Sequence, residues 1–143
     1  MLARARSLRG ARVKVGVLDD ATKEGHDGGS VEMSLLEVAA VHEFGAPGAG
    51  IPQRSFVRAT VDAQRPEIER LQKALAVQVL AGKLDPSVAL DLLGAKVAAM
   101  IQNRIAEGIG PALKPETIAR KGSSKPLVDT GQLRSSITWK VEV

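Results

Sequence analysis

The hydrophobic positions of this chain alternate near both ends and recur at helical spacing between them. Strict alternation with polar or small residues has the period of a half-buried β-strand. The alternating apolar residues of the first segment are Val13, Val15 and Val17. Those of the last segment are Ile137, Trp139, Val141 and Val143. Because strands distant in sequence can pair, we expect segments 13–18 and 137–143 to lie in one small sheet.

A short helix is predicted after a polar loop. The segment from Asp19 to Ser30 is rich in glycine and polar residues, which indicates a loop. Good helix formers then run from Ser30 or Met33 to His42. We expect this helix to end near Gly45, where glycine can take the left-handed cap conformation.

A helical hairpin is predicted over the middle of the chain. Helical spacing covers 54–64 and resumes over 68–79, and Pro66 between them is expected to kink or break the helix because proline lacks a backbone donor. Asp85 and Pro86 suit the N-cap and first position of a second helix, which we expect to end at Gly108 or Gly110. Two apolar stripes joined by a few residues should face each other. The stripe of the second helix consists of Leu90, Leu93, Val97, Met100, Ile101 and Ile105.

The remaining elements complete an α+β fold. Segment 113–122 predicts one or two helical turns, and Asp129 or Thr130 is expected to cap a short turn before the last strand. We therefore expect a small antiparallel or mixed β-sheet packed against a long helical hairpin and short helices. A basic N-terminal arm, 1–12, is predicted to precede one domain, 13–143.

Composition adds three constraints. The 143 residues suit one domain, but the only aromatic residues are Phe44, Phe56 and Trp139, so the core must be modest and oligomer formation is one way to supplement it. The absence of cysteine excludes disulfides and thiolate zinc sites. The sequence contains neither a signal-peptide apolar region nor an apolar run of about 18 residues, so we expect a soluble protein made in the cytoplasm.

Positive charge is concentrated at the N-terminus. The net charge is +4, and five basic residues precede the first acidic residue, Asp19. They could contact nucleic-acid phosphates, or they could belong to a solvated or partner-bound terminus. The arm has no aromatic residue for base stacking. The five residues are Arg4, Arg6, Arg9, Arg12 and Lys14.

Three segments imitate catalytic motifs, and each lacks part of what its chemistry needs. His42 begins a zinc-protease-like HEFGA, but Ala46 stands where the second ligand belongs and the other histidine, His26, is in the predicted loop. GAPGAG lacks the lysine and hydroxyl residue of a phosphate-binding loop. The aspartic-protease-like LVDTG is followed by only twelve residues after Gly131. We expect no enzymatic activity, no metal and no cofactor.

Two stretches, 39–62 and 113–141, together resemble the tail-completion or head–tail joining (neck) proteins of tailed bacteriophages. In that family a His/Glu-x-Phe-Gly element leads through a Gly/Pro loop into Pro-x-Arg-x-Phe and a long helix, and a Pro-Leu-hydrophobic-Asp-Thr-Gly-x-Leu-Arg segment precedes a strand. One departure is Ser55, where proline is frequent, and the basic arm is not part of the pattern. The matching residues are His42, Glu43, Phe44, Gly45, Pro52, Arg54, Phe56, Pro126, Leu127, Asp129, Thr130, Gly131, Leu133, Arg134 and Ser136.

The resemblance implies a non-enzymatic virion protein of the phage neck, assembled in the host cytoplasm. It implies a homo-oligomeric ring, with six copies the natural guess, between the head connector and the tail-terminator or tail-tube proteins. DNA is expected to pass through the lumen of this ring, and neither specific nucleic-acid binding nor membrane contact is expected. Two alternatives remain: a tail-terminator ring that caps the tail tube, and a small DNA-binding packaging accessory protein.

The matched residues are candidates for subunit or partner contacts. Phe44 and Phe56 are large apolar groups that could anchor an interface, or they could fill the core. Arg54, Arg58 and Arg134 could form bidentate pairs with carboxylates of a neighbour, or they could be solvated. The full candidate set is His42, Glu43, Phe44, Gly45, Pro52, Arg54, Phe56, Arg58, Asp129, Thr130, Gly131, Leu133 and Arg134.

Overall fold

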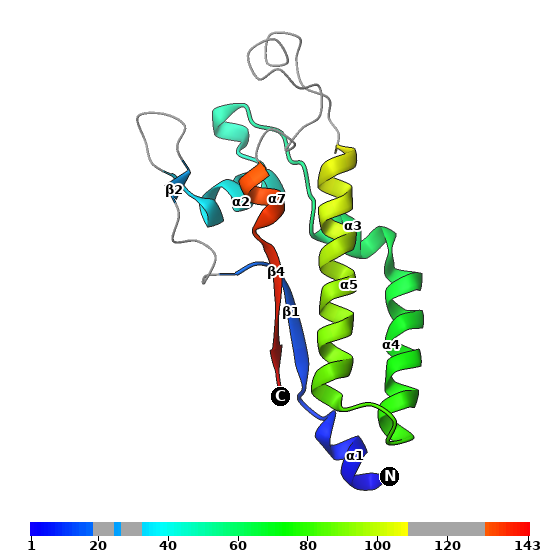
Figure 1. The fold of residues 1–143 in the computed structure, drawn as a ribbon. Helices are drawn as coiled ribbons and strands as arrows, with labels where there is room; N and C mark the ends of the chain where they lie inside the picture. Colours follow the sequence, from blue (N-terminus) through cyan, green and yellow to red (C-terminus); the bar gives the residue numbers. More distant parts are fainter. Residues whose placement is uncertain (19–24, 27–32, 109–130) are drawn as a thin grey trace.

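The computed structural model describes residues 1–18, 25–26, 33–108 and 131–143. Over these ranges the fold is α+β, as the sequence predicts (Figure 1). No helix within these ranges combines the length and the apolar character needed to cross a bilayer. The elements are α1 (Leu2–Ser7), β1 (Arg12–Val17), β2 (Gly25–His26), β3 (Met33–Ser34), α2 (Leu35–Phe44), the 3-10 turn η2 (Pro47–Ala49), α3 (Arg58–Ala63), α4 (Arg65–Leu80), α5 (Pro86–Glu107), α7 (Gly131–Ser135) and β4 (Ile137–Glu142).

The predicted pairing of the two terminal strands is confirmed. β1 and β4 are antiparallel, with Val15 opposite Trp139 and Val13 opposite Val141. Since facing residues share one side of a sheet, these apolar side chains form a single face, and α5 packs along it. The other face carries the alternate pairs of the register. These pairs are Arg12 with Glu142, Lys14 with Lys140, and Gly16 with Thr138.

The predicted helical hairpin is also confirmed, and only one of its helices covers the sheet. α5 lies between the strands and α4, so that α4 forms an outer layer (Figure 1). Asp85 caps α5, because its carboxylate accepts from the Ser87 N–H at 2.8 Å, and Pro86 takes the first helical position. α5 ends at Gly108, where φ is 86°.

The break at Pro66 is present, but the helix before it is shorter than predicted. α3 ends at Ala63 and α4 begins at Arg65, with Pro66 in its first turn. The prediction that this helix starts at Arg54 was wrong. Residues 54–57 are not helical, because their backbone donors bind groups at the end of α2. α3 therefore starts at Arg58.

The region before α2 also differs from the prediction. Gly25–His26, predicted as loop, pairs antiparallel with Met33–Ser34, predicted as possible helix. The helix begins at Leu35, because Ser34 and Glu37 form a reciprocal capping box. At the other end, Gly45 has φ 74° and ψ 173°, so it has a positive φ without the left-handed helical conformation that the sequence predicts.

The N-terminal arm and the segment after α5 complete the comparison. Residues Leu2–Ser7 form the helix α1, whose side chains are exposed, and β1 begins at Arg12, one residue inside the predicted arm. The helical turns predicted over 113–122, and the cap predicted at Asp129 or Thr130, lie outside the described residues.

The core lies where α2, α5, α7 and the sheet meet. Its central side chains are at most 3% exposed. Leucine and isoleucine supply most of this core, with one aromatic residue, as the composition indicates. The central residues are Leu35, Phe56, Ile101, Ile105, Leu133 and Ile137.

A glycine inside α5 lets the sheet approach the helix closely. A Cβ atom at Gly94 would lie 2.6 Å from Cδ1 of Trp139 and 2.7 Å from Cγ2 of Val13. The Trp139 indole N–H donates to the Asp91 carboxylate at 2.8 Å, one helical turn away. Trp139 thus fixes β4 on α5 through a close contact and a hydrogen bond.

Candidate interface loop and basic face

The first matched stretch forms a closed loop after α2, which we call the Glu43 loop (residues 45–57). Ala46 and Ile51 pair as an antiparallel bridge, with N···O distances of 2.9 and 3.0 Å. The 3-10 turn Pro47–Ala49 connects them. Gly45 is required at the base, since a Cβ there would lie 2.8 Å from the Gln53 backbone nitrogen. The GAPGAG segment is therefore a turn connection.

The carboxylate of Glu43 holds the far end of this loop. Its Oε2 accepts the backbone N–H groups of Phe56 at 2.9 Å and Val57 at 3.0 Å. Its Oε1 accepts the Arg58 N–H at 3.0 Å and the Ser55 hydroxyl at 2.8 Å. These donors precede and begin α3, where backbone N–H groups have no helical partner. Glu43 therefore joins the end of α2 to the start of α3 and caps α3 from a distance in sequence.

Two further contacts close the same junction. The Arg54 N–H donates to the His42 carbonyl at 2.8 Å, and the Gln53 side-chain amide donates to the Glu43 carbonyl at 2.9 Å. Ser55, the departure from the family pattern, also accepts the Ala59 N–H through its hydroxyl at 3.1 Å. A hydroxyl at this position therefore caps α3 in addition to binding Glu43.

The environment of Glu43 favours its ionised form. Partial burial acts to raise the pKa of the Glu43 carboxyl, but hydrogen bonds from the Val57 and Arg58 backbone, the Ser55 hydroxyl and the Phe56 backbone outweigh it. The pKa therefore lies below its ordinary value, and the carboxylate is charged at neutral pH. Glu43 was predicted as a contact residue, and here its carboxylate binds groups of its own chain.

The two phenylalanines of the loop region have opposite environments. Phe56 is 1% exposed and belongs to the core, so packing within the chain is the alternative observed for it. Phe44 is 70% exposed at the last position of α2, next to the residue that holds the loop. Phe44 is therefore the aromatic side chain available for contact with another molecule.

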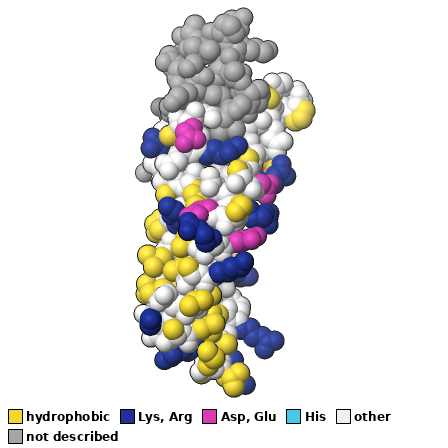
Figure 2. Space-filling view, turned by 90° about the vertical axis from the view of Figure 1, so that its right-hand side faces the viewer, with side chains coloured by type: hydrophobic (Ala, Val, Ile, Leu, Met, Phe, Trp, Pro, Cys, Tyr) yellow, Lys and Arg dark blue, Asp and Glu magenta, His cyan; other side chains and the backbone are white. Residues whose placement is uncertain are grey.

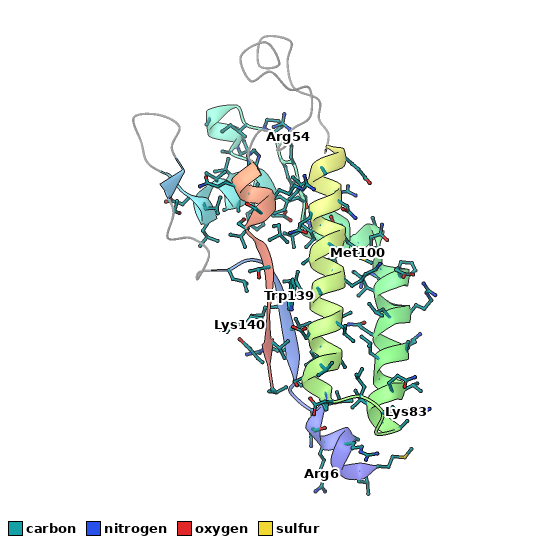
Figure 3. The ribbon with its side chains drawn as sticks, viewed as in Figure 1. Arg6, Arg54, Lys83, Met100, Trp139 and Lys140 are labelled. Carbon is teal, nitrogen blue, oxygen red and sulfur yellow. The ribbon has the colours of Figure 1, made fainter. Side chains whose placement is uncertain are left out.

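The other candidates divide in the same way. Arg54 is 8% exposed, so it is not a solvated surface arginine, and it lies at the end of the molecule opposite α1 (Figure 3). Leu133 is fully buried, which places this matched residue in the core. His42, Glu43 and Gly45 are half-buried. The exposed candidates besides Phe44 are Pro52, Arg58, Gly131 and Arg134.

The second matched stretch is described only from Gly131 onward. Pro126, Leu127, Asp129 and Thr130 lie outside the described residues. Arg134 of α7 lines a shallow cleft of about 300 Å³ together with Gln102, Ala106, Gly131 and Ser135. The described part of the chain holds no group of three or more histidine, cysteine or acidic side chains that could bind a metal ion.

The basic residues of the arm lie on or beside α1 and β1, and Lys140 of β4 lies opposite Lys14. We call this set the basic face: Arg4, Arg6, Arg9, Arg12, Lys14 and Lys140. Arg12 and Lys14 project from β1 and both pair with the Glu142 carboxylate, Lys14 at 2.8 Å. These two cations lower the pKa of Glu142 to about 2. Arg4 lies against the hairpin turn, where its guanidinium occupies the space that a Cβ at Gly82 would need.

Several residues with specific contacts in the structure could not be recognised from the sequence. Asp91, Gly94 and Lys140 were not identified as special residues, because each sits in a regular pattern of helix or strand. The interruption of a helical apolar stripe by Gly94 was the available clue, since glycine disfavours a helix interior unless packing requires it.

Comparisons of this chain with protein-family models, curated protein sequences and solved structures found no match.

Proposed function

We propose that this chain is a structural subunit of the neck of a tailed bacteriophage, where copies of it form a ring that joins or completes the tail at the head. The family assignment is supported by the resemblance of segments 39–62 and 113–141 to neck proteins. The observation that carries the assembly role is an exposed Phe44 at the end of α2, directly before a loop whose far end is bound by Glu43.

A rigid aromatic contact is well suited to assembly. An exposed aromatic ring buries a large apolar area on contact, and few rotamers are lost when its backbone is already fixed. The hydrogen bonds of Glu43 hold the backbone of Phe56 and Arg58, at the start of α3, against the end of α2 where Phe44 lies. Such anchors commonly dominate the energy of an interface.

A second apolar patch lies on the hairpin. Val77 of α4 is 62% exposed, and Val88 and Leu92 of α5 are 46% and 48% exposed. Figure 2 shows hydrophobic side chains gathered over the lower half of the face that includes α4. Rings with closed symmetry use two different patches, one on each neighbouring copy. Phe44 and the hairpin patch are two such patches on separate parts of the subunit.

Replacement of Phe44 tests this proposal. Phe44→Ser should shift the purified full-length chain from oligomer to monomer in sedimentation velocity, while thermal stability stays within about 0.5 kcal/mol because the side chain is exposed. The matched control is Leu36→Ser, an exposed apolar residue of the same helix with 41% exposure. Assembly by Phe44→Ser as strong as that of the unmodified chain would contradict the proposed role of this residue.

A small DNA-binding accessory protein is the second candidate function. The observation that favours it is the basic face formed by α1 and the two terminal strands. The two candidates differ in assembly, since an accessory protein can act without a ring. Neighbouring genes for portal and tail-tube proteins in the genome that encodes this chain would support the neck proposal.

A further inference from the structure

The excess of positive over negative charge is concentrated in the two terminal segments of this chain. Segments 1–17 and 137–143, which include α1, β1 and β4, contain six Lys or Arg residues and one Glu, a formal charge of +5. The whole chain carries +4, so the remaining residues together carry −1. The antiparallel pairing of β1 with β4 brings the two ends of the chain together and concentrates this charge.

The basic side chains share the face of the ribbon that α5 does not cover. In an antiparallel pair, facing residues and their second neighbours lie on one side. The apolar partners of the register face α5, so the alternate pairs face outward. Arg12 and Lys14 have side chains that are 68% and 53% exposed, and Figure 3 shows Lys140 directed away from the helices.

The register places like charges directly opposite each other. Lys14 faces Lys140 across the strands, so that two positive side chains lie next to each other on the outward face. Glu142 is the only acidic residue of either strand, and Arg12 shares its carboxylate with Lys14. The three cations on the outward side of the ribbon, Arg12, Lys14 and Lys140, therefore outnumber the one carboxylate of the two strands.

Helix α1 extends the same charge beyond the ribbon. Arg4 lies against the hairpin turn at Gly82, and Arg6 points away from the body of the molecule at the same end (Figure 3). Arg9 follows α1 and is exposed. At a rise of about 3.3 Å per residue, the six-residue strands span roughly 20 Å, over which a parallel DNA duplex presents about a dozen phosphate charges.

We propose that this basic face binds the phosphate backbone of double-stranded DNA without sequence preference. The outward positions of the ribbon other than the charged ones are Gly16 and Thr138, whose side chains are small or absent. Phosphate contacts need only cations and donors at the surface. The proposal rests on the proposed function in one respect: in the ring, this face would be turned toward the DNA in the lumen.

The test measures binding of the full-length chain to two unrelated 40-base-pair duplexes by fluorescence anisotropy over a range of salt concentrations. Five neutralised phosphates predict a slope of log K against log salt of about −4 to −5, equal for both duplexes. Lys14→Gln with Lys140→Gln should weaken binding at least tenfold at low salt and reduce the slope by about 2. Lys14→Gln also removes the ion pair with Glu142, so circular dichroism must show that this double variant is folded at the temperature of the binding assay.

A matched pair controls for net charge. Arg65→Gln with Arg70→Gln removes two positive charges from the exposed surface of α4, and these variants should bind DNA nearly as the unmodified chain does. Equal weakening by both pairs, affinity independent of salt, or tighter binding to poly-glutamate than to DNA would overturn the proposal. A chain that binds DNA but forms no oligomer would support the DNA-binding proposal and contradict the ring. A chain that forms oligomers but does not bind DNA would support the ring and contradict the DNA-binding proposal.

Discussion

The carboxylate of Glu43 accepts the backbone N–H of Phe56 at 2.9 Å, although thirteen residues separate them. This bond holds the exposed Phe44, at the end of α2, at a fixed distance from the buried Phe56, which lies two residues before α3. It makes the loop between them a defined surface, because the far end of the loop is bound by a residue of the helix from which the loop starts.

Removal of the Glu43 carboxylate should destabilise the fold. Glu43→Ala leaves the N–H groups of Phe56, Val57 and Arg58 without their acceptor, and we expect a loss of about 2 kcal/mol in the free energy of unfolding by urea. Glu69→Ala, on the exposed surface of α4, is the control and should change it by less than about 0.5 kcal/mol. If Glu43→Ala leaves the free energy of unfolding unchanged, water replaces the carboxylate at these N–H groups without loss of stability, which would contradict this prediction.

The contribution of Glu43 should depend on pH. The folded pKa is lowered below the value of 4.5 expected for the unfolded chain, so the stabilisation is fully present above pH 4.5 and is lost as pH falls through the folded pKa. The difference in stability between the unmodified chain and Glu43→Gln should therefore be constant from pH 5.5 to 7.5 and shrink below about 4.5. A difference unchanged at pH 3 would mean that the charge is not what the backbone donors recognise.

Glu142 should titrate at an acidic pH because two cations share it. Lys14 and Arg12 lower its pKa from 4.5 to about 2. Carboxyl-selective NMR should show this, and Lys14→Gln with Arg12→Gln should return the pKa toward 4.5. An unshifted Glu142 in the unmodified chain would show that the ion pairs do not persist in solution.

Substitution of Gly94 should separate packing from helix propensity. Alanine favours a helix by about 1 kcal/mol over glycine, yet its Cβ would meet Trp139 and Val13 at 2.6 to 2.7 Å. We expect Gly94→Ala to lower the free energy of unfolding by about 1 to 3 kcal/mol through overpacking. Gly131→Ala, where no atom of the described residues beyond the chain neighbours would lie within 4 Å of the added Cβ, should be neutral or stabilising and serves as the control.

Regular elements of this fold could be predicted from local patterns. The alternation in β1 and β4 predicted two strands, and the N-cap Asp85 with Pro86 predicted the start of α5. These signals are local in sequence and have direct backbone causes. The antiparallel direction and the register of the strands were not fixed by the sequence, because they depend on how the chain returns in space.

The errors arose where a distant group decides the local backbone. The predicted start of the helix at Arg54 was wrong, since Glu43 binds the N–H groups that precede Arg58. No propensity scale contains that contact. For the same reason the motif residues Phe44 and Phe56 looked equivalent in sequence, although one is exposed and the other is buried in the core.

The most direct test of ring assembly is native mass spectrometry of the full-length chain at increasing concentration, with negative-stain microscopy of the same samples. The assembly account predicts one closed oligomer of fixed copy number, six being the expected value, which Phe44→Ser reduces to monomers that remain folded. A chain that stays monomeric at every concentration, even when phage connector and tail-tube proteins are added, would contradict the account.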